Sequence, residues 1–198
     1  GEMCGSLADI LAFSFYPTKN LGAYGDAGMI VTNSKILHDK CKMLRKYGMK
    51  KLYYSEFHGI NSRLDEVQVS ILNFKLKKLN TNILKRRQIA KIYNKNIKNP
   101  QLILPKENNE CYHSYYVYVI RSKKRNKLLN YLRKNNVFCN ISYPFPIHLM
   151  RGYKYLKYKK GALPITEKLS NEILSIPMYP YLNLRKINKV IKILNEFN

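Results

Sequence analysis

The sequence predicts an α/β protein built from two parts, and three observations support this prediction. Short apolar segments alternate with longer segments in which apolar residues recur at helical spacing. After Pro100 a second series of strand and helix patterns begins. Hydrophobic residues make up 45% of the 198 residues, enough for a packed core. We therefore expect a first domain over residues 1–98 and a small α/β domain with its own sheet over residues 99–198.

The first part is predicted to contain two strands and three helices. Pro17 ends the first strand, which should be buried because it is short, apolar and rich in aromatic residues. Asn33 or Ser34 can cap the first helix, and Gly48 should end it. The predicted elements are strands at 11–16 and 29–32, a helix from 34 to 47, a polar loop at 49–61, and helices at 64–79 and 82–97.

The second part repeats this alternation of strands and helices. Residues 114–120 (SYYVYVI) consist largely of the aromatic and β-branched residues that favour strands. Apolar residues recur at helical spacing from Leu184 to Phe197, so we expect a helix with one buried face there. The predicted elements are a strand at 114–120, a helix at 123–135, a strand at 137–143, and two final helices with Thr166 and Asn183 as N-caps.

The chain is strongly basic, with 36 Lys and Arg residues against 12 Asp and Glu residues and a net charge of +24. Such a balance is typical of proteins that bind nucleic acid or anionic membranes. The excess, however, consists of 27 Lys and only 9 Arg, and Lys, Asn, Ile and Tyr all have A/T-rich codons. The basic runs are also short and interrupted by apolar residues, as on solvated helix faces. A basic nucleic-acid-binding module remains the alternative interpretation.

The cysteines and histidines indicate no metal site. The four cysteines are widely spaced without a Cys-x-x-Cys pair, which favours buried thiols in a reducing compartment. The four histidines are equally scattered, and none belongs to a His-Glu-x-x-His motif. We find neither a run of about 18 apolar residues nor a signal peptide. The sequence therefore predicts a cytoplasmic protein without a membrane partner or a bound metal.

The segment FSFYPTKNLGAYGDAGMIVT (residues 13–32) carries the strongest indication of chemistry. Ser14 and Lys19 follow the end of the first predicted strand, and three glycines separate Lys19 from the second strand. The glycine spacing fits neither a Walker A loop nor a dinucleotide-binding motif. A single lysine is usually a solvated surface residue. Next to a buried strand, however, burial would lower the pKa of Lys19 and free its amine for nucleophilic work.

Four ordered segments of the sequence resemble the DegT/DnrJ/EryC1/StrS family of sugar aminotransferases, which use pyridoxal 5′-phosphate (PLP). They are SFYPTKNLG with the following GD-x-G-x-x-VT, HGINSRLDEVQ (58–68), PIHLM (146–150) and LSNEILSIPMYPYL (169–182). The resemblance implies the fold-type-I, aspartate-aminotransferase-like fold, with a truncated large domain and a small C-terminal α/β domain. It runs from just before the family lysine to the C-terminus. We therefore expect the family's N-terminal half, with the aspartate that pairs with the pyridine nitrogen, to be missing.

The resemblance also gives roles to particular residues. Lys19 would bind PLP covalently and act as the acid–base of the reaction, and Ser14 would donate a hydrogen bond to the cofactor phosphate. Asn61 would reach the phosphate in a neighbouring subunit, and Arg63 would bind an anionic group of the substrate nearby. Asn61 or Ser62 could instead simply cap the next helix. His148 would line the sugar-nucleotide pocket, although a purely structural role fits it equally well.

Together these roles imply a transaminase that moves an amino group from an amino acid, glutamate in the first instance, to a nucleotide-linked keto-deoxy sugar. Family members that remove a sugar hydroxyl instead have histidine at the position of Lys19, so aminotransfer is favoured here. The resemblance further implies a cytoplasmic homodimer with shared active sites. The alternatives are the nucleic-acid-binding module and an inactive remnant of a split gene. We expect the 198 residues to be inactive alone and to expose sheet edges and apolar surface.

Overall fold

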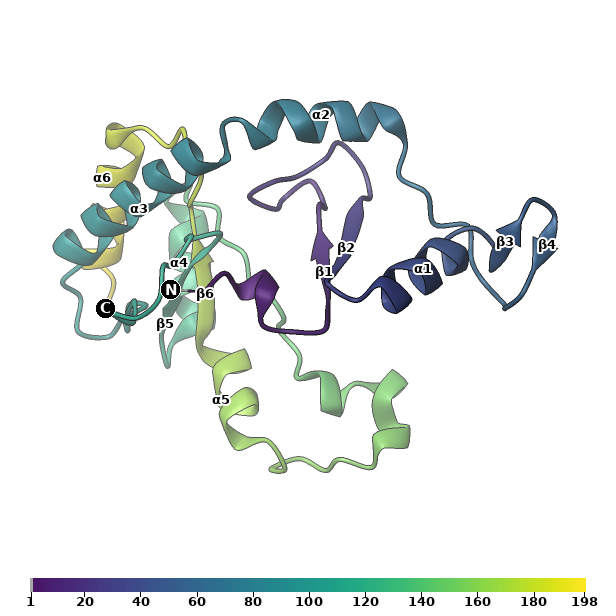
Figure 1. The fold of residues 1–198 in the computed structure, drawn as a ribbon. Coiled ribbons are helices and arrows are strands. Elements are labelled where there is room, and N and C mark those ends of the chain that lie inside the picture. The colour runs from purple at the N-terminus through teal and green to yellow at the C-terminus, as the bar shows by residue number, and fades with distance from the viewer. Residues whose placement is uncertain (1) are drawn as a thin grey trace. The chain divides into compact units, whose positions relative to one another are not determined.

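The computed structural model describes residues 2–198 and divides into two compact units, one ending at Asn82 and one beginning at Ile83 (Figure 1). The division falls in the first turn of the helix α3 (Leu79–Asn96). The domain boundary expected at residues 98–99 lies just beyond the end of this helix, and it remains a prediction.

The first unit contains a two-stranded antiparallel sheet, a small hairpin and two helices. In the sheet, Ser14 lies opposite Gly28 at one end and Ile10 lies opposite Thr32 at the other. Both strands lie where the sequence predicts them, although the first ends at Ser14 rather than Tyr16. The elements are η1 (Cys4–Ser6), β1 (Ile10–Ser14), β2 (Gly28–Thr32), α1 (Lys35–Leu44), β3 (Met49–Lys51), β4 (Tyr54–Ser55) and α2 (Glu66–Leu76).

Helix α1 begins and ends close to its predicted limits. The hydroxyl of Ser34 accepts a hydrogen bond from the N–H of Leu37 at 3.3 Å, which confirms Ser34 as the N-cap. The helix ends at Leu44, and Gly48 follows with a φ of +73°. A Cβ atom on Gly48 would lie 1.9 Å from the carbonyl oxygen of Phe57. Glycine is therefore required at this position on two grounds.

Residues 49–61, predicted as a loop, contain the hairpin of β3 and β4. Met49 lies opposite Ser55, and Lys51 lies opposite Tyr54. The turn between the two strands contains Tyr53 with a φ of +64°. Such a turn normally contains Asn-Gly or Asp-Gly, and neither pair occurs here. The hairpin therefore has no turn signal in the sequence.

The predicted burial of the first strand is wrong for this chain. The side chains of β1 and β2 are largely exposed, with Phe13 at 40% and Ile30 at 54%. Among the described residues of the first unit, only Ala23 and Leu72 are buried hydrophobic residues. Apolar strands become buried only when another layer packs on them, and most side chains of these two strands are exposed. This confirms the expectation of exposed apolar surface.

The second unit has a two-stranded antiparallel sheet of its own, as predicted for a small α/β domain. Tyr118 lies opposite Ile176, and Ile120 lies opposite Leu174. All four side chains are buried in a core that includes residues of three helices. The elements are α3 (Leu79–Asn96), β5 (Tyr118–Arg121), α4 (Arg125–Lys134), η2 (Ile147–Leu149), η3 (Arg151–Leu156), α5 (Pro164–Glu172), β6 (Ile173–Ile176) and α6 (Leu184–Asn195).

The structure of this unit differs from the sequence prediction in several places, and the strand predicted at 114–120 covers only Tyr118–Arg121. The strand expected at 137–143 is replaced by irregular chain with one bridge between Asn140 and Ser175. The strand at 173–176 was not predicted. Helix α5 begins at Pro164 with Leu163 in the N-cap position, so Thr166 lies inside the helix instead of capping it. Proline is favourable in the first turn because it has no N–H that would need a partner there.

Helix α6 packs into the core of the second unit, and its C-terminal end contacts the segment that follows α3. Asn183 caps it as predicted, because its side chain accepts a hydrogen bond from the N–H of Lys186 at 2.9 Å. Farther along, Asn99 donates from Nδ2 to the carbonyl oxygens of Leu194 at 2.8 Å and Phe197 at 2.7 Å. Phe197 is only 2% exposed. The segment that follows α3 is therefore hydrogen-bonded directly to the C-terminal end of the second unit.

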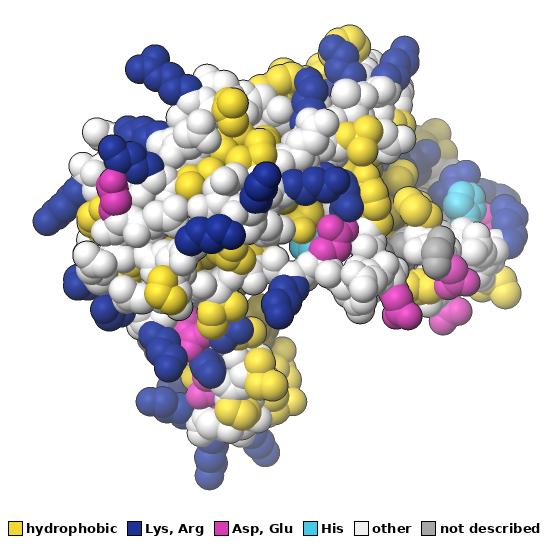
Figure 2. All heavy atoms as spheres, turned by 90° about the vertical axis from the view of Figure 1, so that its left-hand side faces the viewer, with side chains coloured by type: hydrophobic (Ala, Val, Ile, Leu, Met, Phe, Trp, Pro, Cys, Tyr) yellow, Lys and Arg dark blue, Asp and Glu magenta, His cyan; other side chains and the backbone are white. Residues whose placement is uncertain are grey.

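The basic charge is unevenly divided between the units. Residues 83–198 contain 24 of the basic and 5 of the acidic residues, so the second unit carries +19 of the total +24. On the face shown in Figure 2, Lys and Arg side chains are dispersed among apolar and neutral ones and do not form one patch. Within residues 2–198, no helix is both long and apolar enough to cross a bilayer.

Candidate functional site

Lys19 lies at the end of a tight turn that directly follows β1. Its N–H donates to the carbonyl oxygen of Tyr16 at 2.8 Å, which closes a four-residue turn with Pro17 in the second position. Proline favours that position because its ring presets the required φ. Ser14, the last residue of β1, accepts a hydrogen bond on Oγ from the N–H of Tyr16 at 3.3 Å. Tyr16 thus connects the serine and the lysine within one short segment.

The chain after Lys19 folds back tightly on this turn. A Cβ atom on Gly22 would lie 2.4 Å from the carbonyl oxygen of Pro17, so only glycine fits. Helix α2 then fixes the returning chain from outside. Gln68 Oε1 accepts a hydrogen bond from the N–H of Tyr24 at 2.8 Å, and the ammonium of Lys75 donates to the carbonyl oxygen of Gly22.

The chemistry of this loop fits a phosphorylated cofactor that is attached to an amine. The side chain of Ser14 is exposed at the end of its strand, where its hydroxyl can donate to an anion without bringing a charge. Lys19, five residues later, supplies the amine and is half-buried. Asn20 Oδ1 is buried without a hydrogen-bond partner among the described residues. A buried acceptor of this kind can receive a donor from a bound group.

Asn61 and Arg63 form a second pair in the first unit. Arg63 Nε donates to Asn61 Oδ1 at 3.0 Å, and both side chains are exposed. Asn61 also forms a backbone bridge with Lys46, just beyond the end of α1. Helix α2 begins at Glu66 with Asp65 in the N-cap position. The alternative in which Asn61 or Ser62 caps this helix is therefore wrong.

The two pairs lie at different ends of the first unit. Ser14 is at the end of the β1–β2 ladder that is far from Thr32, whereas α1 starts just after Thr32. Figure 1 shows α1 leading away from the sheet to the β3–β4 hairpin, and Asn61 forms its bridge with Lys46 between α1 and this hairpin. Within one chain, the structure therefore joins Ser14 with Lys19 and Asn61 with Arg63, but does not join these pairs to each other.

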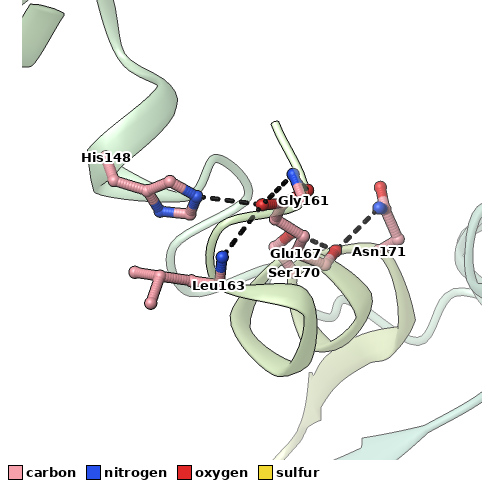
Figure 3. Close-up of polar contacts among 6 residues, drawn as sticks. All are labelled: His148, Gly161, Leu163, Glu167, Ser170 and Asn171. Carbon is pink, nitrogen blue, oxygen red and sulfur yellow. Dashed lines mark hydrogen bonds and ion pairs between the residues drawn. The ribbon is translucent and has the colours of Figure 1, made fainter. Parts of the chain in front are cut away.

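His148 lies in the second unit, in the short helix η2. Its side chain is only 5% exposed, and Nε2 lies 3.1 Å from Oε1 of Glu167 (Figure 3). Its ring packs against Tyr158 in a T-shaped arrangement, with the ring centroids 5.9 Å apart and the planes at 76°. The hydrogen bond with His148 lowers the pKa of Glu167, and the N–H groups of Gly161 and Leu163 add to this effect. His148 is thus a buried, oriented histidine rather than a mobile loop residue.

Sequence reasoning missed two residues that organise these sites. Gln68 belongs to the motif HGINSRLDEVQ, so its place in a functional segment was visible, but its contact with Tyr24 spans 44 residues. Glu167 lies in α5, 19 residues from His148, and no local pattern links the two. The predicted burial of all thiols also fails, because Cys111 is exposed, whereas Cys41 and Cys139 are half-buried.

Comparison with known proteins identifies the family of the chain. Residues 1–195 match the DegT/DnrJ/EryC1/StrS aminotransferase family. Because this match covers almost the whole chain, the protein belongs to that family. The family membership and the mixed α/β fold inferred from the four sequence segments are both confirmed.

Particular relatives show what share of their own length the chain spans. The dTDP-3-amino-3,4,6-trideoxy-alpha-D-glucose transaminase of Micromonospora megalomicea is 43% identical over 202 residues, which cover 99% of this chain and 54% of the relative. The crystal structure of DesV from S. venezuelae superposes with a TM-score of 0.90 at 33% identity, covering 94% of this chain and 51% of DesV. NtdA of Bacillus subtilis, solved with bound cofactor PMP, superposes at 0.85 with 26% identity, covering 96% of this chain and 46% of NtdA. The chain thus spans about half the length of the relatives that it matches.

Proposed function

We propose that this chain supplies the lysine-bearing half of a PLP-dependent sugar aminotransferase. The enzyme would move an amino group from an amino acid, glutamate in the first instance, to a nucleotide-linked keto-deoxy sugar. The observation that carries the proposal is the loop in which Lys19 follows Ser14 at the end of a strand, in a chain that matches the family over residues 1–195. Relatives named as dTDP-sugar and UDP-sugar aminotransferases support the substrate class.

Ser14 and Lys19 have different roles in this loop because their side chains have different chemistry. The exposed hydroxyl of Ser14 donates to the phosphate of the cofactor. The turn at Pro17 fixes the backbone of Lys19 relative to Ser14. PLP, when bound, supplies the electron sink for the charge that develops at the reacting carbon. The amine of Lys19 holds the cofactor and then carries the proton removed from the Cα atom of the amino donor.

Asn61 and Arg63 are proposed to serve the site of a neighbouring subunit in a homodimer. The support is their position, because both side chains are exposed and lie at a different end of the unit from Ser14. The guanidinium of Arg63 orients the amide of Asn61 and keeps further N–H groups available for an anion. His148 is proposed to line the sugar-nucleotide pocket. The assembled enzyme is proposed to work in the cytoplasm, where nucleotide sugars and PLP are available.

Covalent attachment of PLP to Lys19 tests the central claim. The purified protein is mixed with PLP, its visible absorbance is recorded, and the adduct is reduced with borohydride and mapped by mass spectrometry. We expect the modification on Lys19 and its loss in Lys19→Ala. Lys123→Ala, at an exposed lysine of the second unit, is the matched control and should keep the adduct. A wild-type adduct at another lysine, or an undiminished adduct in Lys19→Ala, would contradict the proposal.

Mixing two inactive variants of the assembled enzyme, in which this chain supplies the lysine-bearing half, tests the shared site. A mixed dimer contains one Lys19→Ala subunit and one Asn61→Ala subunit. If the site is shared, one of its two sites combines the intact Lys19 of the second subunit with the intact Asn61 of the first. Random mixing of equal amounts should restore about a quarter of the wild-type activity, because half of the dimers are mixed. If Asn61 acts within its own chain, mixing restores none.

A further inference from the structure

Glu167 joins three separate segments of the second unit through one carboxylate. Oε1 lies 3.1 Å from Nε2 of His148 in η2. The N–H of Gly161 donates to both carboxylate oxygens, at 2.8 and 3.0 Å, and the N–H of Leu163 donates to Oε1 at 3.4 Å. The Glu167 side chain is only 15% exposed. Figure 3 shows the carboxylate between the imidazole ring and the loop that precedes α5.

This arrangement determines which nitrogen of His148 carries the hydrogen. The hydrogen bonds around Glu167 lower its pKa, so its carboxylate is ionised at neutral pH and can only accept hydrogen bonds. Nε2 must then be the donor in the contact with Glu167. In the neutral ring the other nitrogen, Nδ1, is consequently an acceptor. Figure 3 shows this second nitrogen on the side of the ring that faces away from Glu167.

The ring is also held in a fixed orientation. His148 is 5% exposed at its side chain, and its ring packs against Tyr158 in a T-shaped arrangement. Glu167 in turn belongs to α5, which continues directly into β6. Arg125 Nη1 donates to the carbonyl oxygens of Ser170 and Ile173, each at 3.2 Å, and so ties the end of this helix to α4. The carboxylate that orients the imidazole is therefore itself held by a helix that is fixed at its end.

We propose that Glu167 is a positioning residue that fixes His148 with Nε2 protonated and thereby presents Nδ1 as a hydrogen-bond acceptor for a hydroxyl group of the sugar. This inference rests on the proposed function, in which His148 lines the sugar-nucleotide pocket. Hydroxyl groups are the donors that a sugar offers, and a neutral acceptor on a fixed ring can select one of them by position. The amino-donor step makes no use of this contact.

The tautomer of His148 can be measured directly in the ¹⁵N-labelled protein by NMR of the ring nitrogens. At a pH where the ¹⁵N shifts themselves show a neutral ring, we expect Nε2 to carry the hydrogen in the wild type. In Glu167→Gln the ratio of the two tautomers should change by about tenfold, because a neutral amide replaces a charged acceptor. Glu110→Gln, which alters an exposed glutamate of the same unit, is the control and should leave the ratio unchanged.

Either of two NMR results would overturn the proposal. The first is an unchanged tautomer ratio in Glu167→Gln. The second is a wild-type His148 with Nδ1 protonated, which decides the question even where Glu167→Gln fails to fold by circular dichroism. Neither measurement needs PLP or substrate. A missing PLP adduct on wild-type Lys19 would contradict the proposed function. This result is independent of the tautomer measurement, so the two failures can be distinguished.

Steady-state kinetics of the assembled enzyme with bound PLP, in which this chain supplies the lysine-bearing half, test the role toward the sugar. In Glu167→Gln we expect KM for a dTDP-linked keto sugar to rise about tenfold, which corresponds to one lost hydrogen bond with a well-placed acceptor. The half-reaction with glutamate should keep its wild-type rate. Equal losses in both half-reactions would show that Glu167 acts only on the fold and would refute the positioning role.

Discussion

Replacing Arg86 with alanine should destabilise the second unit, because this side chain connects α3 with two other segments. Nη1 of Arg86 lies 3.3 Å from the carbonyl oxygen of Tyr115, 2.9 Å from that of Tyr116 and 2.9 Å from that of Met178. The residue is only 8% exposed, and burial lowers its pKa from the ordinary value for arginine. The substitution removes all three contacts and leaves the carbonyl oxygens without this partner.

The expected loss follows from opposing contributions. A hydrogen bond from a charged donor contributes about 1.5–3 kcal/mol, and Nη1 has two hydrogens, one of which is shared with the longer contact to Tyr115, so the total is roughly 5 kcal/mol. Keeping a guanidinium out of water offsets part of this, by several kcal/mol for a fully buried ion and by less here. We expect a net loss of about 3 kcal/mol in the free energy of unfolding. With a urea slope of about 2 kcal/mol/M, the midpoint should fall by about 1.5 M.

Urea unfolding followed by circular dichroism and tyrosine fluorescence measures this midpoint, since the chain has 17 tyrosines and no tryptophan. Arg133→Ala, at an exposed arginine of α4, is the matched control and should change the stability by less than about 0.5 kcal/mol. Arg86→Lys should fall between wild type and Arg86→Ala, because an ammonium cannot reproduce the planar guanidinium. Equal midpoints for Arg86→Ala and Arg133→Ala would refute the reasoning.

Three further predictions concern local features of the second unit. Asn183→Ala should lower the free energy of unfolding by about 1 kcal/mol, because α6 loses its side-chain cap, and thermal unfolding measures this. The hydrogen bond from Arg87, supported by a backbone N–H, lowers the pKa of Glu107 in the folded chain. The stabilisation from Glu107 is therefore complete above its unfolded pKa of about 4.3 and is lost as the pH falls through the lower folded value, so Glu107→Gln should flatten the acid limb of a stability–pH curve. Burial raises the pKa of the Cys139 thiol to about 12, whereas Cys111 is exposed. Iodoacetamide should label Cys111 at least about tenfold faster, as measured by peptide mass spectrometry, and equal rates would contradict the burial of Cys139.

Local signals in the sequence predicted the elements whose determinants are local. Ser34 and Asn183 were identified as N-caps because a cap needs only a side chain and an N–H three residues later. The strand β6 was not predicted, because a segment of four residues, three of them apolar, becomes a strand only by pairing with β5, more than 50 residues earlier. The burial of β1 was mispredicted for a related reason. Its exposure depends on what packs over it, which no pattern within residues 11–16 can specify.

In the candidate site, too, the residues in local motifs could be predicted and the contacts between segments could not. Ser14 and Lys19 were found from one contiguous motif, and the turn at Pro17 that relates them is equally local. Asn61 came from the family motif, but its contact with Arg63 and its separation from Ser14 required the fold. Glu167 was missed because its importance arises from its partner in another segment. Contacts between distant segments carry most of what the sequence alone could not supply.

The bonds from Asn99 to the carbonyl oxygens of Leu194 and Phe197 have a consequence for synthesis of the protein. The core of the second unit contains Ile89 near its beginning and Phe197 near its end, so it cannot close while the last helix is still inside the ribosome. Until residue 197 leaves the ribosome, the apolar faces of α3 and α4 are exposed because α6 cannot yet pack on them. Folding of this unit is therefore a late event that begins only when nearly the whole unit has been translated.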